Sequence, residues 1–213
     1  MFFLNQDLLK YSEKNTSKHN LILNELERET QQKVLFPRML CGNVIGSILK
    51  LISELKRPKY ILEIGTYTGY SAICLAQGLD NNGQLHTIEI NEELKDIALK
   101  YFKKSHLQDK IKMHTGKALE LIPSINLNFD IVFIDADKKN YCKYFDLVID
   151  KTNKGGYILI DNVLWSGKVI KKIKHNDQET LEIKKLNEKI MLDKRVENIL
   201  LSVRDGLMIC KVL

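Results

Sequence analysis

Residues 60–71 read Tyr-Ile-Leu-Glu-Ile-Gly-Thr-Tyr-Thr-Gly-Tyr-Ser: an apolar run, then a loop with two glycines, then the start of a helical segment. A strand that passes through a glycine-containing loop into a helix points the first helical amides at a ligand, as nucleotide-binding loops do. Tyr67 stands where the Gly-x-Gly-x-x-Gly pattern has its second glycine, which disfavours the pyrophosphate of NAD. Simple turn geometry is the competing explanation for Gly65 and Gly69.

From about residue 59 onward, short β-rich runs alternate with segments of helical period, which predicts a parallel sheet wrapped by helices. We expect strands over residues 60–64, 84–90, 111–115, 130–134, 157–160, 196–203 and 207–212. Between them we expect helices over 71–79, 92–104, 141–151 and 179–190. The last two strands are separated by three residues of turn type, Arg204, Asp205 and Gly206, which predicts a hairpin at one end of the sheet.

The segment before this sheet is predicted to be helical over residues 20–33 and 38–55. We therefore expect a single domain over residues 1–213, in which residues 1–58 form a helical extension that covers the sheet. Hydrophobic residues make up 44% of the chain and charged residues 28%, which indicates a soluble globular protein. We see neither a basic leader nor an apolar run long enough for a membrane span, so we predict a cytoplasmic protein without membrane contact.

Charge and cysteine content exclude some classes of protein. The net charge of +6 favours anionic partners without requiring nucleic acid, because the excess lysines are scattered along the chain. The four cysteines are widely separated and none belongs to a Cys-x-x-Cys pair. Neither a zinc site nor a disulfide framework is therefore indicated.

Carboxylates occur at or next to the ends of several predicted strands. Glu63 and Glu89 lie at or near the ends of the first and second strands, and Asp135 and Asp161 directly follow the fourth and fifth. Ligands of open α/β sheets bind beyond the carboxyl ends of the strands, so these acids are candidates for a binding site. Glu89 is placed to accept hydrogen bonds from both hydroxyls of an adenosine ribose. Each acid taken alone is equally well explained as a helix cap or a solvated turn.

A second cluster follows the fourth and fifth strands. Asp135, Asp161 and Asn162 offer only oxygen ligands from neighbouring strand ends, which suits Mg²⁺ or Ca²⁺; a hydrogen-bonded network that fixes the loops is the alternative. Lys138 lies close enough to share such a site and to act as a general base, unless it is an ordinary exposed lysine. Trp165 is placed to flank a flat aromatic substrate, or else to anchor its loop in the core.

Three motifs make a family resemblance visible: Ile-Leu-Glu-Ile-Gly-Thr-Tyr-Thr-Gly-Tyr-Ser at 61–71, Phe-Ile-Asp-Ala-Asp-Lys at 133–138, and Asp-Asn-Val-Leu-Trp-Ser-Gly at 161–167. From about residue 36 to residue 213 the chain resembles the cation-dependent O-methyltransferases related to catechol and caffeoyl-CoA O-methyltransferases. The resemblance implies a Rossmann-like, seven-stranded, mostly parallel sheet with helices on both faces and its last strand antiparallel. It also implies S-adenosylmethionine as cofactor, a divalent cation (Mg²⁺ first, Ca²⁺ or Mn²⁺ otherwise), and a homodimer.

The resemblance assigns a role to individual residues. Asp135, Asp161 and Asn162 match the metal ligands, and Lys138 matches the catalytic base. The residues that match cofactor contacts are Met39 of the N-terminal cover, Glu63, Gly65 and Ser71 on the methionine side, Glu89 at the ribose, Ala118 beside the adenine, and Asp135, Asp137 and Tyr144 near the amino-acid end.

The function implied is metal-dependent transfer of a methyl group to a hydroxyl of a catechol-like small molecule, with Trp165 at the substrate. No carboxylate occurs from residue 198 to 204, where catechol-specific animal relatives place one, so a preference for catecholamines is not supported. The first alternative is a methyltransferase for a hydroxylated uridine of tRNA, since bacterial proteins of this resemblance include such enzymes. A non-catalytic cofactor-binding protein and, more distantly, a dehydrogenase are the others.

Overall fold

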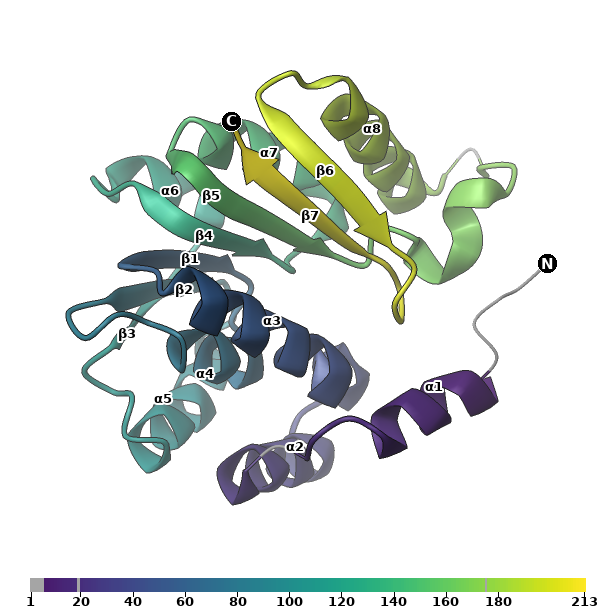
Figure 1. Cartoon of the computed structure of the whole chain (residues 1–213). Coiled ribbons are helices and arrows are strands. Elements are labelled where there is room, and N and C mark those ends of the chain that lie inside the picture. Colours follow the sequence, from purple (N-terminus) through teal and green to yellow (C-terminus); the bar gives the residue numbers. More distant parts are fainter. Residues whose placement is uncertain (1–5, 19, 175) are drawn as a thin grey trace.

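The computed structural model describes residues 6–18, 20–174 and 176–213, and its centre is one sheet with the strand order β3-β2-β1-β4-β5-β7-β6 (Figure 1). Strand β7 runs antiparallel to β5 and β6, whereas the pairs among β1 to β5 are all parallel. The strands are β1 (Tyr60–Ile64), β2 (Gln84–Glu89), β3 (Ile111–Thr115), β4 (Phe129–Ile134), β5 (Thr152–Asp161), β6 (Val196–Leu201) and β7 (Leu207–Val212). The predicted sheet and its antiparallel last strand are confirmed.

Alternating apolar side chains explain why the central strands are buried on both faces. In β4, Ile131 and Phe133 belong to one hydrophobic core, and Val132 and Ile134 belong to the other. Successive side chains of a strand point to opposite faces, so a strand of continuous apolar residues requires a helical layer on each side. Burial of these side chains stabilises the three-layer arrangement.

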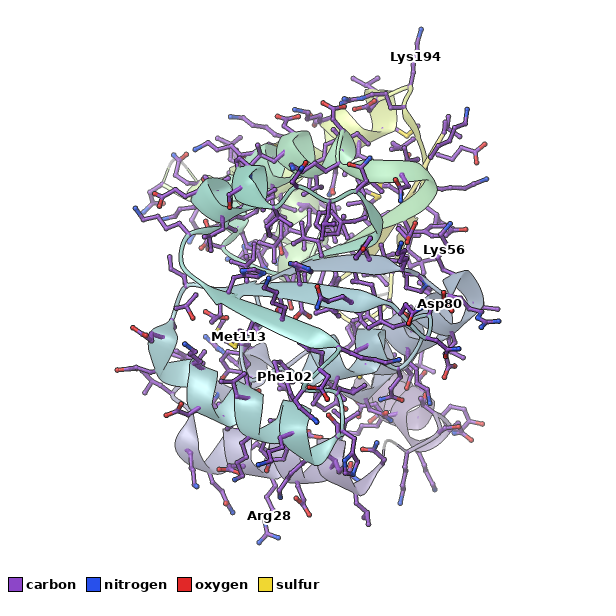
Figure 2. The ribbon with its side chains drawn as sticks, turned by 90° about the vertical axis from the view of Figure 1, so that its left-hand side faces the viewer. Arg28, Lys56, Asp80, Phe102, Met113 and Lys194 are labelled. Carbon is purple, nitrogen blue, oxygen red and sulfur yellow. The ribbon has the colours of Figure 1, made fainter. Side chains whose placement is uncertain are left out.

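Helices cover both faces of the sheet, as Figures 1 and 2 show. On one face, Phe102 of the helix over residues 95–104 belongs to the hydrophobic core against which Met113 of β3 packs (Figure 2). That face carries α2 (Leu21–Lys33), α3 (Gly42–Lys56), α4 (Tyr70–Ala76) and α5 (Lys95–Lys104), and the other carries α6 (Ala118–Ser124), α7 (Tyr141–Ile149) and α8 (Gln178–Leu192). The fold is therefore Rossmann-like.

The N-terminal helices lie against this layer. The side chain of Glu29 in α2 accepts hydrogen bonds from Lys100 and Tyr101 of α5, and the hydroxyl of Thr30 donates to that of Thr68 at 3.1 Å. Thr68 belongs to the loop after β1, so α2 is tied directly to the predicted ligand loop. A shorter helix, α1 (Gln6–Lys14), precedes α2 and contacts α3. The predicted helical cover is present in the described part of residues 1–58.

Several predicted boundaries were wrong. Helices α1 and α6 were not predicted, and the expected helix over 38–55 is interrupted: a 3₁₀ turn, η1 (Pro37–Met39), comes first, and α3 begins only at Gly42. The interruption has a backbone cause, since Leu40 is extended and Gly42 has φ +72°. Strands β2 and β6 end one and two residues early, and β5 begins at Thr152 instead of residue 157.

Among the described residues, no helix is both long and apolar enough to cross a membrane. Residues 1–5, where we saw no leader, lie outside the described part of the chain.

Candidate active site

A large pocket opens at the carboxyl ends of the parallel strands, and its volume is about 1920 Å³. Single drug-sized ligands occupy roughly 300–1,000 Å³, so this pocket has room for two molecules. All but one of the predicted site residues line it: Met39, Gly65, Ser71, Glu89, Ala118, Asp135, Asp137, Lys138, Tyr144, Asp161, Asn162 and Trp165. The exception is Glu63.

The loop after β1 forms one wall of the pocket. Gly65 has φ +101°, and a Cβ built on it would lie 2.3 Å from the carbonyl oxygen of Asp135. Gly69 has φ +93°, and its Cβ would meet the ring of Phe102 at 2.6 Å. Turn geometry alone accounts for the positive φ of both glycines, but the close approach to Asp135 is an additional requirement. Gly65 thus lets the loop pack directly against the residue that follows β4, and Gly69 lets it pack against Phe102.

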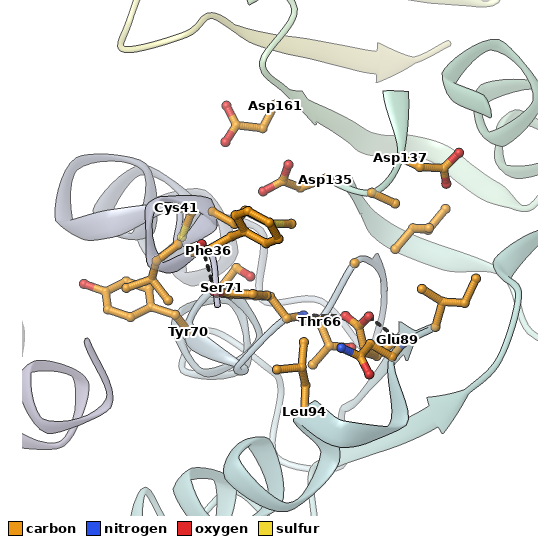
Figure 3. A pocket seen from close by; sticks show the side chains of 18 of the residues that line it. Phe36, Cys41, Thr66, Tyr70, Ser71, Glu89, Leu94, Asp135, Asp137 and Asp161 are labelled. Carbon is orange, nitrogen blue, oxygen red and sulfur yellow. Dashed lines mark hydrogen bonds between the residues drawn. The ribbon is translucent and has the colours of Figure 1, made fainter. Parts of the chain in front are cut away.

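Glu89 ends β2 and is anchored by backbone amides. Its Oε2 accepts a hydrogen bond from the amide of Tyr67 at 2.7 Å, and its Oε1 accepts one from the amide of Asn91 at 2.9 Å (Figure 3). A carboxylate has about four acceptor positions, so each oxygen keeps capacity for a ligand hydroxyl. Tyr67, with φ +50°, also donates from its hydroxyl to the carbonyl oxygen of Phe36 at 3.0 Å.

Glu63 lies beneath the pocket and is completely buried. Its carboxyl group receives hydrogen bonds from the side chains of Thr87 and Ser71, and its Oε1 has no protein partner in the described structure. Burial raises the pKa of Glu63 to about 8, against the opposing effect of these hydrogen bonds. It is linked to the pocket through Ser71 and, by way of Thr87, through Thr66, and both Ser71 and Thr66 line the pocket.

Two carboxylates meet at the other end of the pocket. Asp161 is the last residue of β5 and 4% exposed, Asp135 directly follows β4, and both side chains lie on the same side of the pocket (Figure 3). Burial and the negative charge of Asp135 raise the pKa of Asp161. The adjacent Asn162 has φ +62°. Its backbone amide donates a hydrogen bond to Asp161 Oδ1 at 2.8 Å. Two neighbouring acids, one buried and one partly buried, form a place where a bound cation would relieve charge repulsion.

The donor chemistry at this end fits a hard divalent cation. Carboxylate oxygens and the amide oxygen of Asn162 are ligands that Mg²⁺, Ca²⁺ and Mn²⁺ accept. Within the described residues, no group of three or more His, Cys, Asp and Glu side chains is arranged to hold a metal. The predicted set is consistent with that observation, because only two of its three members are carboxylates.

Lys138 is buried between these acids and two aromatic rings. Its Nζ donates to Asp135 Oδ1 at 2.9 Å and to the hydroxyl of Tyr141 at 2.6 Å, and lies 5.8 Å from the centre of the Trp165 ring. The Tyr141 hydroxyl in turn donates to the backbone oxygen of Asp161 at 3.2 Å. Sequence reasoning missed Tyr141, although its spacing of three residues from Lys138 puts both side chains on one helical face.

A further pair of side chains closes the pocket beside α7. The hydroxyl of Tyr144 donates a hydrogen bond to Asp137 Oδ1. The side-chain amide of Asn140 donates to Asp137 Oδ2 at 2.6 Å. Burial and the hydrogen bond to Asp137 raise the pKa of Tyr144, so the phenol stays neutral and remains a donor. Ala118, the first residue of α6, and Met39 of η1 also line the pocket.

Comparison with known proteins identifies the family of this chain. A family model described as O-methyltransferase matches residues 12–213, nearly the whole chain. The chain belongs to this family and is an S-adenosylmethionine-dependent O-methyltransferase. The enzyme is 34% identical over 180 residues to caffeoyl-CoA O-methyltransferase 2 of Eucalyptus globulus, covering 78% of this chain and 72% of that protein.

Solved structures agree with this assignment. An O-methyltransferase from Bacillus cereus, solved in complex with SAH, is 30% identical with a TM-score of 0.89, covering 97% of each chain. TomG from Streptomyces achromogenes, solved in complex with SAM, is 26% identical with a TM-score of 0.88, covering 100% of this chain and 99% of that one. The predicted enzyme class is confirmed over both a non-catalytic cofactor-binding protein and a dehydrogenase.

Proposed function

We propose that this methyltransferase transfers a methyl group from S-adenosylmethionine to one hydroxyl of a catechol-like small molecule, with a divalent cation held by Asp135, Asp161 and Asn162. The observation that carries the proposal is the convergence of two carboxylates, Lys138 and Trp165 at one end of a pocket with room for two ligands. A vicinal diol offers two adjacent oxygens to such a cation, and its flat ring suits the Trp165 side chain.

The cofactor is proposed to occupy the part of the pocket next to the loop after β1. The free acceptor capacity of Glu89 supports hydrogen bonds to the ribose hydroxyls. Ala118 is assigned to the adenine and Met39 to the cover. The methionine portion of the cofactor is assigned to Glu63, Gly65, Ser71, Asp135, Asp137 and Tyr144. All of these except Glu63 line the pocket, and Glu63 lies beneath it. The two similar structures that were solved with SAH and with SAM support S-adenosylmethionine as the cofactor of this pocket.

The protein groups have distinct tasks in this proposal. A divalent cation, when bound, supplies Lewis acidity toward the acceptor hydroxyl. Lys138 accepts the hydroxyl proton at Nζ, and Tyr141 holds that nitrogen in place through their 2.6 Å hydrogen bond. Attack of a phenolate on a sulfonium cancels charge, so the remaining contribution of the protein is to align the reactants and exclude water.

The test is a comparison of Asp161→Ala with the parent enzyme, using catechol, labelled methyl donor and added Mg²⁺. We expect methyl transfer to disappear while binding of S-adenosylmethionine, followed by calorimetry, remains measurable. The exposed Asp109, which lies outside the pocket, gives a matched Asp109→Ala control that keeps full activity. Full turnover of Asp161→Ala, or of the parent in excess EDTA, would contradict the proposal.

The same assay separates the acceptor classes. Catechols, a CoA thioester and bulk tRNA are offered in parallel, with and without EDTA, at two salt concentrations. We expect methylation of the small catechols. Methyl transfer into tRNA alone, with the steep salt dependence of phosphate contacts, would instead establish the uridine-modifying alternative. The homodimer implied by the family resemblance also stays a prediction, for which light scattering of the purified enzyme is the measurement.

A further inference from the structure

We propose that Arg204 selects acceptors that carry an acidic group, so that the preferred substrate is a vicinal dihydroxy aromatic with a carboxylate on its ring. This inference rests on the proposed function and specifies its substrate class. Arg204 lines the pocket from the turn between β6 and β7. The juxtaposition that carries the proposal is an unpaired guanidinium beside the Asp161 end of the pocket.

The backbone of Arg204 is unusual for a residue with a side chain. The amide of Gly206 donates to the carbonyl oxygen of Val203 at 2.8 Å, so Arg204 is the first central residue of a tight hairpin turn. Its φ is +47°, in the left-handed region, and a positive φ at the first central residue of a β-turn favours glycine there. A strained residue at a ligand pocket is the kind of outlier that points to a functional side chain.

The turn is fastened to the loop that carries Trp165. The amide of Leu164 donates to the backbone oxygen of Asp205 at 2.8 Å, and the amide of Ser166 donates to the Asp205 side chain. The amide of Val163 donates to the backbone oxygen of Gly206 at 3.2 Å. Because this loop directly follows Asp161 and Asn162, the turn holds Arg204 at a fixed place relative to the proposed metal ligands and the substrate wall.

The guanidinium extends from this turn to the N-terminal cover. A Cβ added to Gly42, the first residue of α3, would lie 3.0 Å from Arg204 Nη1. The absence of a side chain at Gly42 therefore leaves space for the guanidinium. The side chain spans from the β6–β7 turn to the start of α3 while remaining exposed to the pocket solvent.

Charge pairing distinguishes Arg204 from the lysines around it. Lys138 is paired with Asp135, and Lys168 with Asp177 at 3.7 Å. Arg204 has no ion pair or hydrogen bond through its side chain within the described residues. A guanidinium with its donors unused presents the planar fork that binds a carboxylate through two parallel hydrogen bonds.

The experiment compares two probes, catechol and 3,4-dihydroxybenzoate, which share the reacting hydroxyls and differ in the carboxylate. For the parent enzyme we expect a lower KM for 3,4-dihydroxybenzoate than for catechol. Arg204→Gln is expected to raise that KM by about tenfold or more, because both charge-assisted hydrogen bonds of the fork are lost, with a much smaller change for catechol and little change in kcat. Arg204→Lys, which keeps the charge without the fork, is expected to restore part of the preference.

A second variant separates recognition from folding. Arg204→Gly places the favoured residue in the turn, so its melting temperature is expected to equal or exceed that of the parent while the preference for the acid is lost. Arg57→Gln is the matched control, because Arg57 also has a left-handed backbone, with φ +50°, but lies at the other end of α3 and outside the pocket. It is expected to change neither KM.

The outcomes distinguish this inference from the function on which it rests. Calorimetry with SAH-loaded enzyme measures binding of the two probes without turnover. If Arg204→Gln weakens both probes equally, or neither, the inference is overturned and the catechol methyltransferase proposal stands. If the parent methylates neither probe in the presence of a divalent cation, both proposals fail.

Discussion

The hydroxyl of Tyr67, in the loop after β1, donates a hydrogen bond to the backbone oxygen of Phe36 at 3.0 Å. The backbone amide of the same residue donates to Glu89 at 2.7 Å. Tyr67 therefore joins the N-terminal cover to the carboxylate assigned to the cofactor ribose. Burial and the charge of Glu89 raise the pKa of the Tyr67 phenol, so it remains a donor at neutral pH.

Removing that hydroxyl is expected to weaken cofactor binding. Tyr67→Phe loses one hydrogen bond to the cover, which is worth about 0.5–1.5 kcal/mol, or roughly a two- to twelvefold rise in the Kd for S-adenosylhomocysteine. Calorimetry measures it, with Tyr157→Phe as control because Tyr157 lies outside the pocket. An unchanged Kd in Tyr67→Phe would show that the cover does not act on the cofactor through this contact.

Gly65 and Gly155 offer a matched pair for separating steric from conformational cost. Both have positive φ, but a Cβ at Gly65 meets the Asp135 carbonyl at 2.3 Å, whereas a Cβ at Gly155 meets nothing within 4 Å. Gly155→Ala is expected to cost about 1–2 kcal/mol of unfolding free energy from backbone conformation alone. Gly65→Ala is expected to lose about a further 1–3 kcal/mol of unfolding free energy, because the added methyl group overpacks the contact with Asp135 and displaces the loop. Urea unfolding of both variants checks this, and equal losses would refute the steric argument.

Glu63 predicts a particular dependence of stability on pH. Its pKa is about 8 in the folded protein and 4.5 as the reference value, so the folded state holds a proton that the unfolded chain releases between these limits. The contribution of protonated Glu63 to the free energy of unfolding is therefore fully present below pH 4.5. It is lost as the pH rises toward 8, by at most about 1.4 kcal/mol per pH unit. Urea unfolding from pH 5 to 8 is expected to show a smaller decline in Glu63→Gln than in the parent. Parallel curves for the two proteins would contradict the raised pKa.

Lys138 and Lys139 are neighbours with opposite surroundings, which provides a control for the proposed base. Lys138 is buried and hydrogen-bonded to Asp135, whereas Lys139 is exposed and lies outside the pocket. Lys138→Met is expected to lower kcat with catechol by about a hundredfold or more, as removal of a general base does, while cofactor binding by calorimetry persists. Lys139→Met should behave like the parent. Comparable kcat values in the two variants would remove Lys138 from the mechanism.

Much of the sheet was predictable because its strands are short apolar runs bounded by turns. Carboxylates at the ends of such strands indicated the pocket, since parallel strands bring their carboxyl ends to one edge, and Asp135 and Asp161 lie together as expected. Helix α6 was missed because it has seven residues and contains Pro123, which normally argues against a helix. Helix α1 has only nine residues and precedes the first helix that was predicted.

The missed site residues depend on tertiary contacts that no local pattern records. Arg204 was recognised only as part of a turn, because its place in the pocket follows from the left-handed turn and from the approach of the hairpin to Gly42, far away in the chain. The role of Glu63 beneath the pocket, and not in its wall, likewise follows from burial under the loop after β1. Spacing along a strand predicted which end of the sheet would carry the site but not the depth of each side chain.

Strand β7 follows β6 in the chain yet lies between β5 and β6 in the sheet. On a ribosome, β6 therefore has no position to occupy until β7 has emerged and paired with β5. The β6–β7 turn, with Arg204 and the backbone contacts that fix the Trp165 loop, forms only at that moment. A nascent chain can thus assemble the cofactor wall from its earlier strands while its acceptor end is still unformed.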